Sequence, residues 1–183
     1  MKKLLWFLCL SYLITAVSIN AQTINFSPSI GIGKVYDNSS VSPNAAFLNL
    51  NAGLKISDNM ICGLRYGAVG TSQNYNASLE LGIFFKYFLP QSDIFFNAGL
   101  FEHKNESTKP MGSIRHTNKN IYLLSVGSGY FVFKNFFVDI TGQIPLGSKI
   151  YRVTVLRNIT NEVEIRSELD FIISVGIGFN FDI

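Results

Sequence analysis

The chain has 183 residues, of which 48% are apolar, and no composition shift or Pro/Ser-rich linker divides it, so we expect one main domain. Of its 15 basic residues two lie in the N-terminal leader, and the remaining 13 face 12 acidic ones, which argues against a nucleic-acid-binding protein. The 15 glycines, 16 phenylalanines and 8 tyrosines favour β-structure. Outside the leader Cys62 is the only cysteine, which excludes an intramolecular disulfide.

The leader, Met1–Ala21, has the pattern of a secretory signal peptide. Two lysines precede an apolar run, which is followed by Ser-Ile-Asn-Ala, and we expect cleavage after Ala21. The exported domain would then comprise residues 22–183. The alternative is an uncleaved membrane anchor, which polar residues between positions 11 and 15 oppose because they interrupt a run barely long enough to span a bilayer.

Eight segments after the leader alternate apolar residues with small or polar ones, which is the period of a β-strand. In chain order they are Thr23–Tyr36, Leu48–Ile56, Met60–Ala68, Ala77–Tyr87, Ile94–Leu100, Tyr122–Val132, Phe136–Ile144 and Leu169–Ile183. The last of them reads LDFIISVGIGFNFDI, with apolar residues at every odd-numbered position and mostly glycine or polar residues at the even ones. Such strands have one face that suits lipid and one that suits a small polar interior.

The connections between these segments alternate in length. Those after the first, third, fifth and seventh segments have roughly eight, seven, seventeen and more than twenty residues, whereas the others have about two to four. Outer-membrane barrels place short turns on the periplasmic side and longer loops outside. The sequence therefore predicts an all-β fold, an eight-stranded antiparallel up-and-down transmembrane β-barrel. Within the longest connection, Ile150–Leu156 and Val163–Ile165 are expected to extend the last two strands as a hairpin beyond the membrane.

Aromatic residues on the apolar face are expected to form two belts, one at each bilayer interface. The belt near the short turns would contain Phe26, Phe85, Tyr87, Phe96, Tyr130, Phe136, Phe179 and Phe181, and the belt near the long loops Tyr36, Tyr66, Tyr122 and Phe171. The assignment requires Leu81, Ile140 and Ile177 to face outward, with residues such as Ser125 inside. An outward position is also expected for Cys62, as a small apolar residue.

The inward face is expected to hold a network of charged residues, because buried charges need partners. We predict that Arg65 and Glu80 lie side by side and that Lys34 pairs with Asp170 where the last strand meets the first. The complete predicted network is Lys34, Lys55, Arg65, Glu80, Lys86, Asp139 and Asp170. Eight strands leave an interior just wide enough for side chains to fill, so no open pore is expected. A gating or ion-passing role for Arg65 and Glu80 is the alternative.

No motif indicates catalysis or a cofactor. Glu102, His103, Glu106 and His116 share one long connection, but their spacing matches no metal motif, and a solvated loop is the simpler interpretation. His103 with Ser107 lacks the spacing of a catalytic triad. We therefore expect no enzyme, no cofactor and no metal site.

The leader, the eight alternating segments and the terminal FNFDI together resemble the bacterial outer-membrane β-barrel domain family, of the small eight-stranded type, over Thr23–Ile183. The resemblance implies insertion by the barrel-assembly machinery, which in such families recognises a final strand with alternating hydrophobic residues and a terminal aromatic residue. Here Phe181 is followed by two more residues.

We expect an integral protein of the bacterial outer membrane, surrounded by outer-membrane lipids, with a structural or surface-interaction role. An extracellular partner of unknown kind would bind through residues Glu102–Asn120 and Pro145–Glu168. The alternative is a secreted or periplasmic lipocalin-like barrel, which requires the apolar face inside, around a lipid.

Overall fold

The computed structural model describes residues 23–38, 44–71, 78–105, 114–157 and 162–183. The predicted signal peptide lies outside these residues. Within the described ranges, a search for an apolar helix of membrane-spanning length finds none. Eight long strands are present: β1 (Ile24–Asp37), β2 (Asn44–Ser57), β3 (Met60–Thr71), β4 (Ser78–Phe88), β5 (Ile94–Asn105), β7 (Ile121–Phe133), β8 (Phe136–Leu146) and β10 (Glu162–Phe179). Three shorter strands accompany them: β6 (Ile114–Asn118), β9 (Ile150–Arg157) and β11 (Phe181–Asp182).

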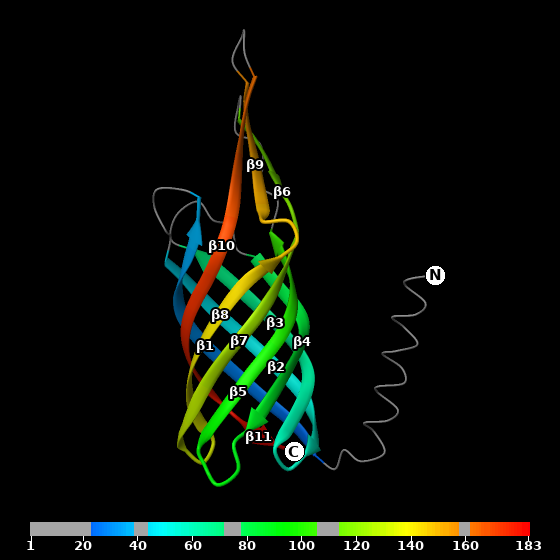
Figure 1. The fold of residues 1–183 in the computed structure, drawn as a ribbon, viewed down its shortest axis with the longest axis vertical. Coiled ribbons are helices and arrows are strands. Elements are labelled where there is room, and N and C mark those ends of the chain that lie inside the picture. Colours follow the sequence, from blue (N-terminus) through cyan, green and yellow to red (C-terminus); the bar gives the residue numbers. More distant parts are fainter. Residues whose placement is uncertain (1–22, 39–43, 72–77, 106–113, 158–161) are drawn as a thin grey trace, which may run out of the picture.

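The eight long strands form a closed antiparallel barrel (Figure 1). Each pairs with the next in the order β1-β2-β3-β4-β5-β7-β8-β10, and β10 pairs back with β1, with Ile30 opposite Ile177. β11 adds to the lower end of β1, where Phe26 lies opposite Phe181. Closure gives both edges of every barrel strand a partner, which is what a strand in a bilayer requires. The prediction of eight alternating strands is confirmed.

A three-stranded sheet rises above the barrel at the end opposite the short turns (Figure 1). It consists of the upper part of β10, β9 and β6 in that order, and Leu156 of β9 is paired with Val163 on one side and Ile114 on the other. The hairpin predicted for this region is confirmed. The interpretation of the long connection after the fifth predicted strand as a solvated loop was wrong, because Ile114–Asn118 forms β6, which pairs with β9 from far along the chain.

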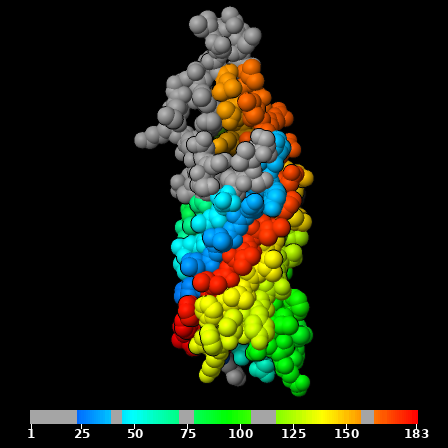
Figure 2. Space-filling view, turned by 90° about the vertical axis from the view of Figure 1, so that its left-hand side faces the viewer, coloured from blue at the N-terminus to red at the C-terminus, as the bar shows by residue number. Residues whose placement is uncertain are grey.

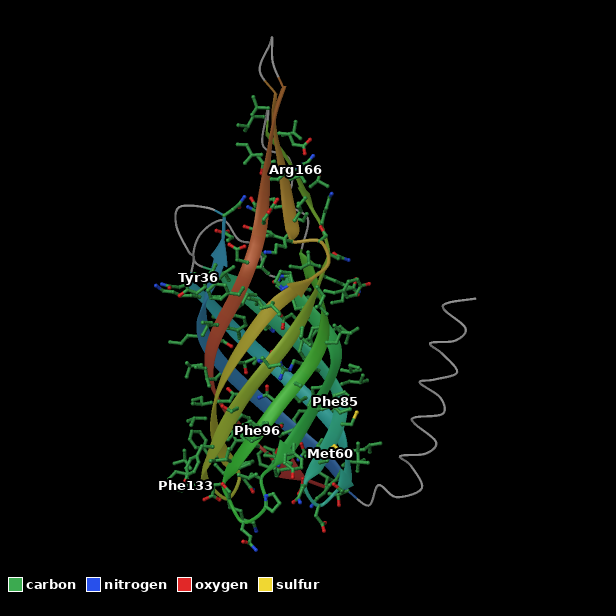
Figure 3. All side chains as sticks on the ribbon, in the orientation of Figure 1. Tyr36, Met60, Phe85, Phe96, Phe133 and Arg166 are labelled. Atoms are coloured by element: carbon green, nitrogen blue, oxygen red, sulfur yellow. The ribbon has the colours of Figure 1, made fainter. Side chains whose placement is uncertain are left out.

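The outer wall of the barrel is apolar, as the alternation predicted. Leu81, Ile140 and Ile177 are 48%, 52% and 43% exposed, whereas Ser125 inside is 1% exposed. Aromatic residues lie on this wall toward both ends: Figure 3 places Tyr36 near the upper end and Phe96 near the lower one. Tyr36 stacks on Phe171, with ring centroids 4.2 Å apart. The outer wall therefore presents hydrocarbon, the surface that a bilayer interior favours.

The interior is filled in three layers. At the upper end an apolar cap consists of Val35, Ala45, Phe47, Val69, Ile121, Leu123, Tyr151, Leu169 and Ile172. A polar layer lies below it. At the lower end an aromatic layer is built around Phe95, whose ring centroid lies 5.3 Å from those of both Phe131 and Phe137. Glycines make room for these rings, since a Cβ on Gly129 would collide with Phe95 and one on Gly178 with Phe137. The polar layer is thus closed off from both ends.

A β-bulge in β10 exchanges the two faces of that strand near its middle. Tyr36 is opposite Phe171, but the next residue, Asp37, is opposite Leu169, so Asp170 is the extra residue. Leu169 consequently points into the apolar cap, and Asp170 points out. The strict alternation predicted over Leu169–Ile183 therefore holds only below the bulge, where it continues past Asn180, which contacts the interior, to the exposed Phe181.

Candidate functional site

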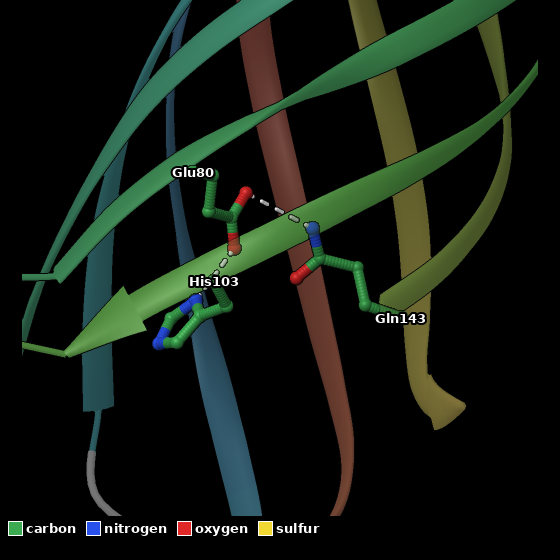
Figure 4. A network of polar contacts seen from close by, with 3 residues as sticks. All are labelled: Glu80, His103 and Gln143. Atoms are coloured by element: carbon green, nitrogen blue, oxygen red, sulfur yellow. Dashed lines mark hydrogen bonds and ion pairs between the residues drawn. The ribbon is translucent and has the colours of Figure 1, made fainter. Parts of the chain in front are cut away.

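A buried carboxylate organises the polar layer (Figure 4). Glu80 on β4 is 1% exposed, and one of its oxygens lies 3.0 Å from Nδ1 of His103 on β5. The other oxygen accepts a hydrogen bond of 3.3 Å from Nε2 of Gln143 on β8. His103 was expected on a solvated loop, which was wrong: β5 continues to Asn105, and the imidazole is 3% exposed inside the barrel. Three strands thus meet at one carboxylate.

Arg65 lies deeper in the same layer and is 7% exposed. Its Nε donates a 2.8 Å hydrogen bond to Oδ1 of Asn51, and its guanidinium carbon lies 4.6 Å from the ring centroid of Phe101, a cation–π contact. Glu80 and Asp139 both attract it electrostatically. In the register Arg65 is opposite Gly82 and Glu80 is opposite Gly67, so the two charges are diagonal neighbours across β3 and β4.

Lys86 holds the lower end of the interior together. Its Nζ donates hydrogen bonds of 3.1 Å to Oγ of Ser27 and 3.5 Å to Oδ1 of Asn180. These bonds link β4 to β1 and to the residue between β10 and β11. The same ammonium group lies 4.8 Å and 4.7 Å from the ring centroids of Phe95 and Phe137. Oxygen acceptors and aromatic faces thereby replace the water that this charge loses on burial.

The predicted network divides between the two sides of the wall. Arg65, Glu80 and Lys86 are buried inside, Asp139 lines a small internal cavity, and Lys55 is half-buried on the inward face of β2 near the lower end. Two assignments need correction, Lys34 and Asp170. Lys34 lies two residues after Ile32 and therefore shares the outward face of β1. The bulge turns Asp170 outward, where its carboxylate contacts the ammonium group of Lys149 at 3.5 Å. The predicted pair across the closing strands is thus absent from the described structure.

No protein-family model matches this chain, and no curated protein matches it. Among solved structures, the outer membrane protein OprG from Pseudomonas aeruginosa matches with a TM-score of 0.54 at 10% identity, over 88% of this chain and 97% of that one. The N-terminal β-barrel domain of OprF from the same organism matches with a TM-score of 0.49 at 16% identity, over 87% and 100%. The chain has the fold of a small outer-membrane β-barrel. This barrel fold accounts for polar and charged side chains that lie inside while the outer wall is apolar.

The lipocalin-like alternative is not supported by this outer-membrane barrel fold. It requires an apolar cavity inside, but here the large apolar side chains of the wall point outward. The internal cavity beside Arg65, Asp139 and Gln143 has a volume of about 20 Å³, room for a single water molecule. This cavity in the described part of the barrel is too small for a lipid.

The described part of the barrel offers no group of three or more side chains suited to a metal ion. Glu106 and Ser107 lie outside the described residues. Glu80 and His103 form a buried pair that is enclosed beneath the apolar cap. What the polar layer does is bind β1, β2, β3, β4, β5 and β8 to one another through side-chain hydrogen bonds.

Sequence reasoning missed His103, Gln143 and Asn51 as members of the polar layer. For His103 the signal was present: Phe95, Asn97, Gly99 and Phe101 continue to it in steps of two along the inward face. It also missed the apolar cap, in which Tyr151 donates a 2.7 Å hydrogen bond to Oδ2 of Asp37. No local pattern joins those two residues, because they lie 114 positions apart.

The sheet above the barrel carries its charges in water. Nε of Arg166 donates a 2.7 Å hydrogen bond to Oε1 of Glu164 two residues earlier, and this bond raises the pKa of the guanidinium above its ordinary value. Both side chains are about half or more exposed. Val163 and Ile165 on the same strand are exposed as well. This sheet therefore displays both charged and apolar groups to its surroundings.

Proposed function

We propose that this protein is an integral, non-conducting barrel of the bacterial outer membrane, exported through a signal peptide cleaved after Ala21. One observation carries the proposal: an outer wall that is predominantly apolar surrounds an interior that side chains close at both ends. An apolar wall requires lipid, and a filled interior leaves no path for solutes. Insertion by the barrel-assembly machinery follows from the same assignment.

The role that we propose is structural or surface-interacting, without catalysis. The regions 102–120 and 145–168 would bind an extracellular partner, and the three-stranded sheet of β6, β9 and upper β10 gives these regions a rigid support. Its exposed Val163 and Ile165 are groups that a partner could cover.

Conductance recording in planar bilayers tests whether the interior of the barrel is closed to ions. We expect wild-type protein to give no single-channel events, and Arg65→Ala to be equally silent, because the apolar cap and the aromatic layer remain in that variant. An open porin in the same bilayers controls for the recording. Discrete events in the wild type would overturn the closed barrel, and events only in Arg65→Ala would favour the gating alternative.

Membrane placement has its own test. We expect the protein to require detergent for extraction and to migrate differently on gels before and after boiling. An epitope inserted between Arg157 and Glu162 should be detected on intact cells, whereas one added after Ile183 should be detected only after lysis. Solubility without detergent would refute the assignment.

A further inference from the structure

A groove interrupts the outer wall toward its upper end. It has a volume of about 870 Å³ and lies where the upper parts of β1, β2, β3 and β10 meet. β1 and β10 run side by side across the face of the molecule shown in Figure 2. The residues that line it are Ile32, Gly33, Lys34, Tyr36, Asn44, Ala45, Ala46, Gly70, Ile173 and Val175. We refer to it as the Lys34 groove. Its volume is in the range of small-molecule binding pockets.

The register of the barrel explains why the wall is recessed there. One row of outward positions crosses the strands as Val175, Ile32, Ala46 and Gly70. The residues of this row on β10 and β1 have branched side chains, whereas β2 contributes only the methyl group of Ala46 and β3 only the hydrogen of Gly70. At Gly70 the space is open, since a Cβ added there would meet nothing within 4 Å. The row below it has Leu48 in place of Ala46, which restores the bulk of the wall. The groove thus has apolar sides and a floor of small residues.

Lys34 is the one cationic residue among the described residues that line this groove. Lys34 is exposed on the outer wall, opposite Ile173 on β10, and no ion pair joins it to any described residue. The next outward position on β1 is Tyr36, which stacks on Phe171 of β10. An aromatic pair of this kind suits the bilayer interface, and a lysine beside it can extend its ammonium group to the headgroup level. A positive charge therefore stands where an apolar groove meets the headgroups.

We propose that the Lys34 groove binds a phosphorylated lipid of the outer leaflet, with one acyl chain against Ile32, Ile173 and Val175 and the phosphate at the ammonium group of Lys34. The inference rests on the proposed function, which places this wall in the outer membrane. The charge of Lys34 is complementary to a phosphate, and the apolar sides are complementary to an acyl chain. A free phosphate ion would leave the apolar part of the groove unused.

A polypeptide strand is a poorer occupant than a lipid. β1 and β10 have strand partners on both sides at the level of Ile32 and Val175, and β2 has them at Ala46, so these backbones offer no free edge to which a strand could add. The occupant must instead fill an apolar recess through side contacts alone and carry a negative charge at one end. A phosphorylated lipid has this chemistry.

Native mass spectrometry of the complete exported chain in detergent tests the proposal. The probes are phosphatidic acid and a diacylglycerol with the same acyl chains. We expect wild-type protein to retain phosphatidic acid about fivefold more than diacylglycerol, the ratio for one lysine near an anionic headgroup. Lys34→Gln should abolish this preference. Gly70→Leu should reduce retention of both lipids, because its side chain occupies the floor of the groove.

Matched controls separate the groove from general effects. Lys134→Gln removes an exposed lysine from the turn between β7 and β8, and Ala98→Leu enlarges an exposed position on the outer wall of β5; both should behave like wild type. Equal retention of the two lipids by wild type, or an unchanged preference in Lys34→Gln, would overturn the proposal. Displacement of phosphatidic acid by inorganic phosphate would also overturn it, in favour of a free-anion site.

The failure of the lipid site and the failure of the proposed function are distinguishable. Each variant is first checked for heat-modifiable gel mobility and for its detergent requirement. A wild-type protein that is soluble without detergent defeats the membrane assignment itself. A detergent-requiring barrel without lipid preference defeats only the Lys34 groove as a phospholipid site.

Discussion

The two halves of β10 are one continuous strand in two different surroundings. Below the bulge, residues 172–178 are paired with β8 on one side and β1 on the other, and the outward residues are apolar. Above it, residues 162–168 are paired with β9 on one side. On the other side Asn38 supplies the contacts, donating from its backbone N to Glu168 O at 3.1 Å and from Nδ2 to Arg166 O at 3.0 Å.

The difference between the halves shows how surroundings determine what a strand tolerates. An open edge in hydrocarbon leaves backbone groups without any partner, so the lower half is paired on both sides. In water the same groups are solvated, so a side chain and solvent suffice for the upper half. Charges follow a similar division: Glu80, Arg65 and Lys86 lie inside the barrel with partners, Lys34 is the exception on the outer wall, and above the bulge Glu164 and Arg166 are exposed.

The largest contrast is expected between two acidic residues. Glu80→Ala removes the buried acceptor of His103 and Gln143 and should lower the unfolding free energy by about 3–5 kcal/mol, the usual result of breaking a buried charged network. Glu164→Ala in the upper half of β10 should leave it unchanged within error. Urea titration in lipid vesicles, followed by gel mobility, measures both. Equal effects would contradict the contrast.

The outer wall gives the next largest effect. Ile140→Arg places a charge on the lipid-facing side near the middle of β8 and should destabilise the barrel by about 2–4 kcal/mol in vesicles. Ile165→Arg is the matched control, since it replaces an isoleucine of similar exposure in the upper half of β10, and it should change stability by less than about 0.5 kcal/mol. A tolerated arginine at position 140 would argue against lipid there.

A smaller effect is expected at the bulge. Asp170 and Lys149 form an ion pair in which both side chains are about half exposed, 52% and 53%. Asp170→Ala should therefore destabilise the protein by about 0–1 kcal/mol, and 0.5 M salt should remove most of the difference. A salt-independent loss above this range would indicate that Asp170 supports the bulge itself.

Removal of the upper sheet is expected to have the least effect on the barrel. Arg152 and Ser167 are directly paired, so replacing residues 153–166 with Asn-Gly should close a two-residue hairpin. Tyr151, which packs in the apolar cap, is retained in this variant. We expect unchanged heat-modifiable mobility and an unchanged urea midpoint. Loss of the folded form would mean that the upper sheet and the barrel fold as one unit.

Much of the barrel was predictable because apolar residues alternate with small or polar ones every second position along its strands. In β4 the alternation of Leu81, Ile83 and Phe85 with Gly82 and Phe84 assigns each residue to a face without knowledge of any neighbour. The alternation of turn lengths then orders the strands. The inward positions of Arg65, Glu80 and Lys86 follow from the same counting.

What the sequence by itself determined is therefore the period of each strand, their number and the side of the wall on which most residues lie, because these depend on nearest neighbours along the chain. Only the tertiary structure decided the bulge that turns Asp170 outward, the pairing of β6 with β9, the convergence of Glu80, His103 and Gln143, and the recess at Lys34. Each of these depends on registers between strands that are distant in the chain, and registers are set by closure of the whole barrel.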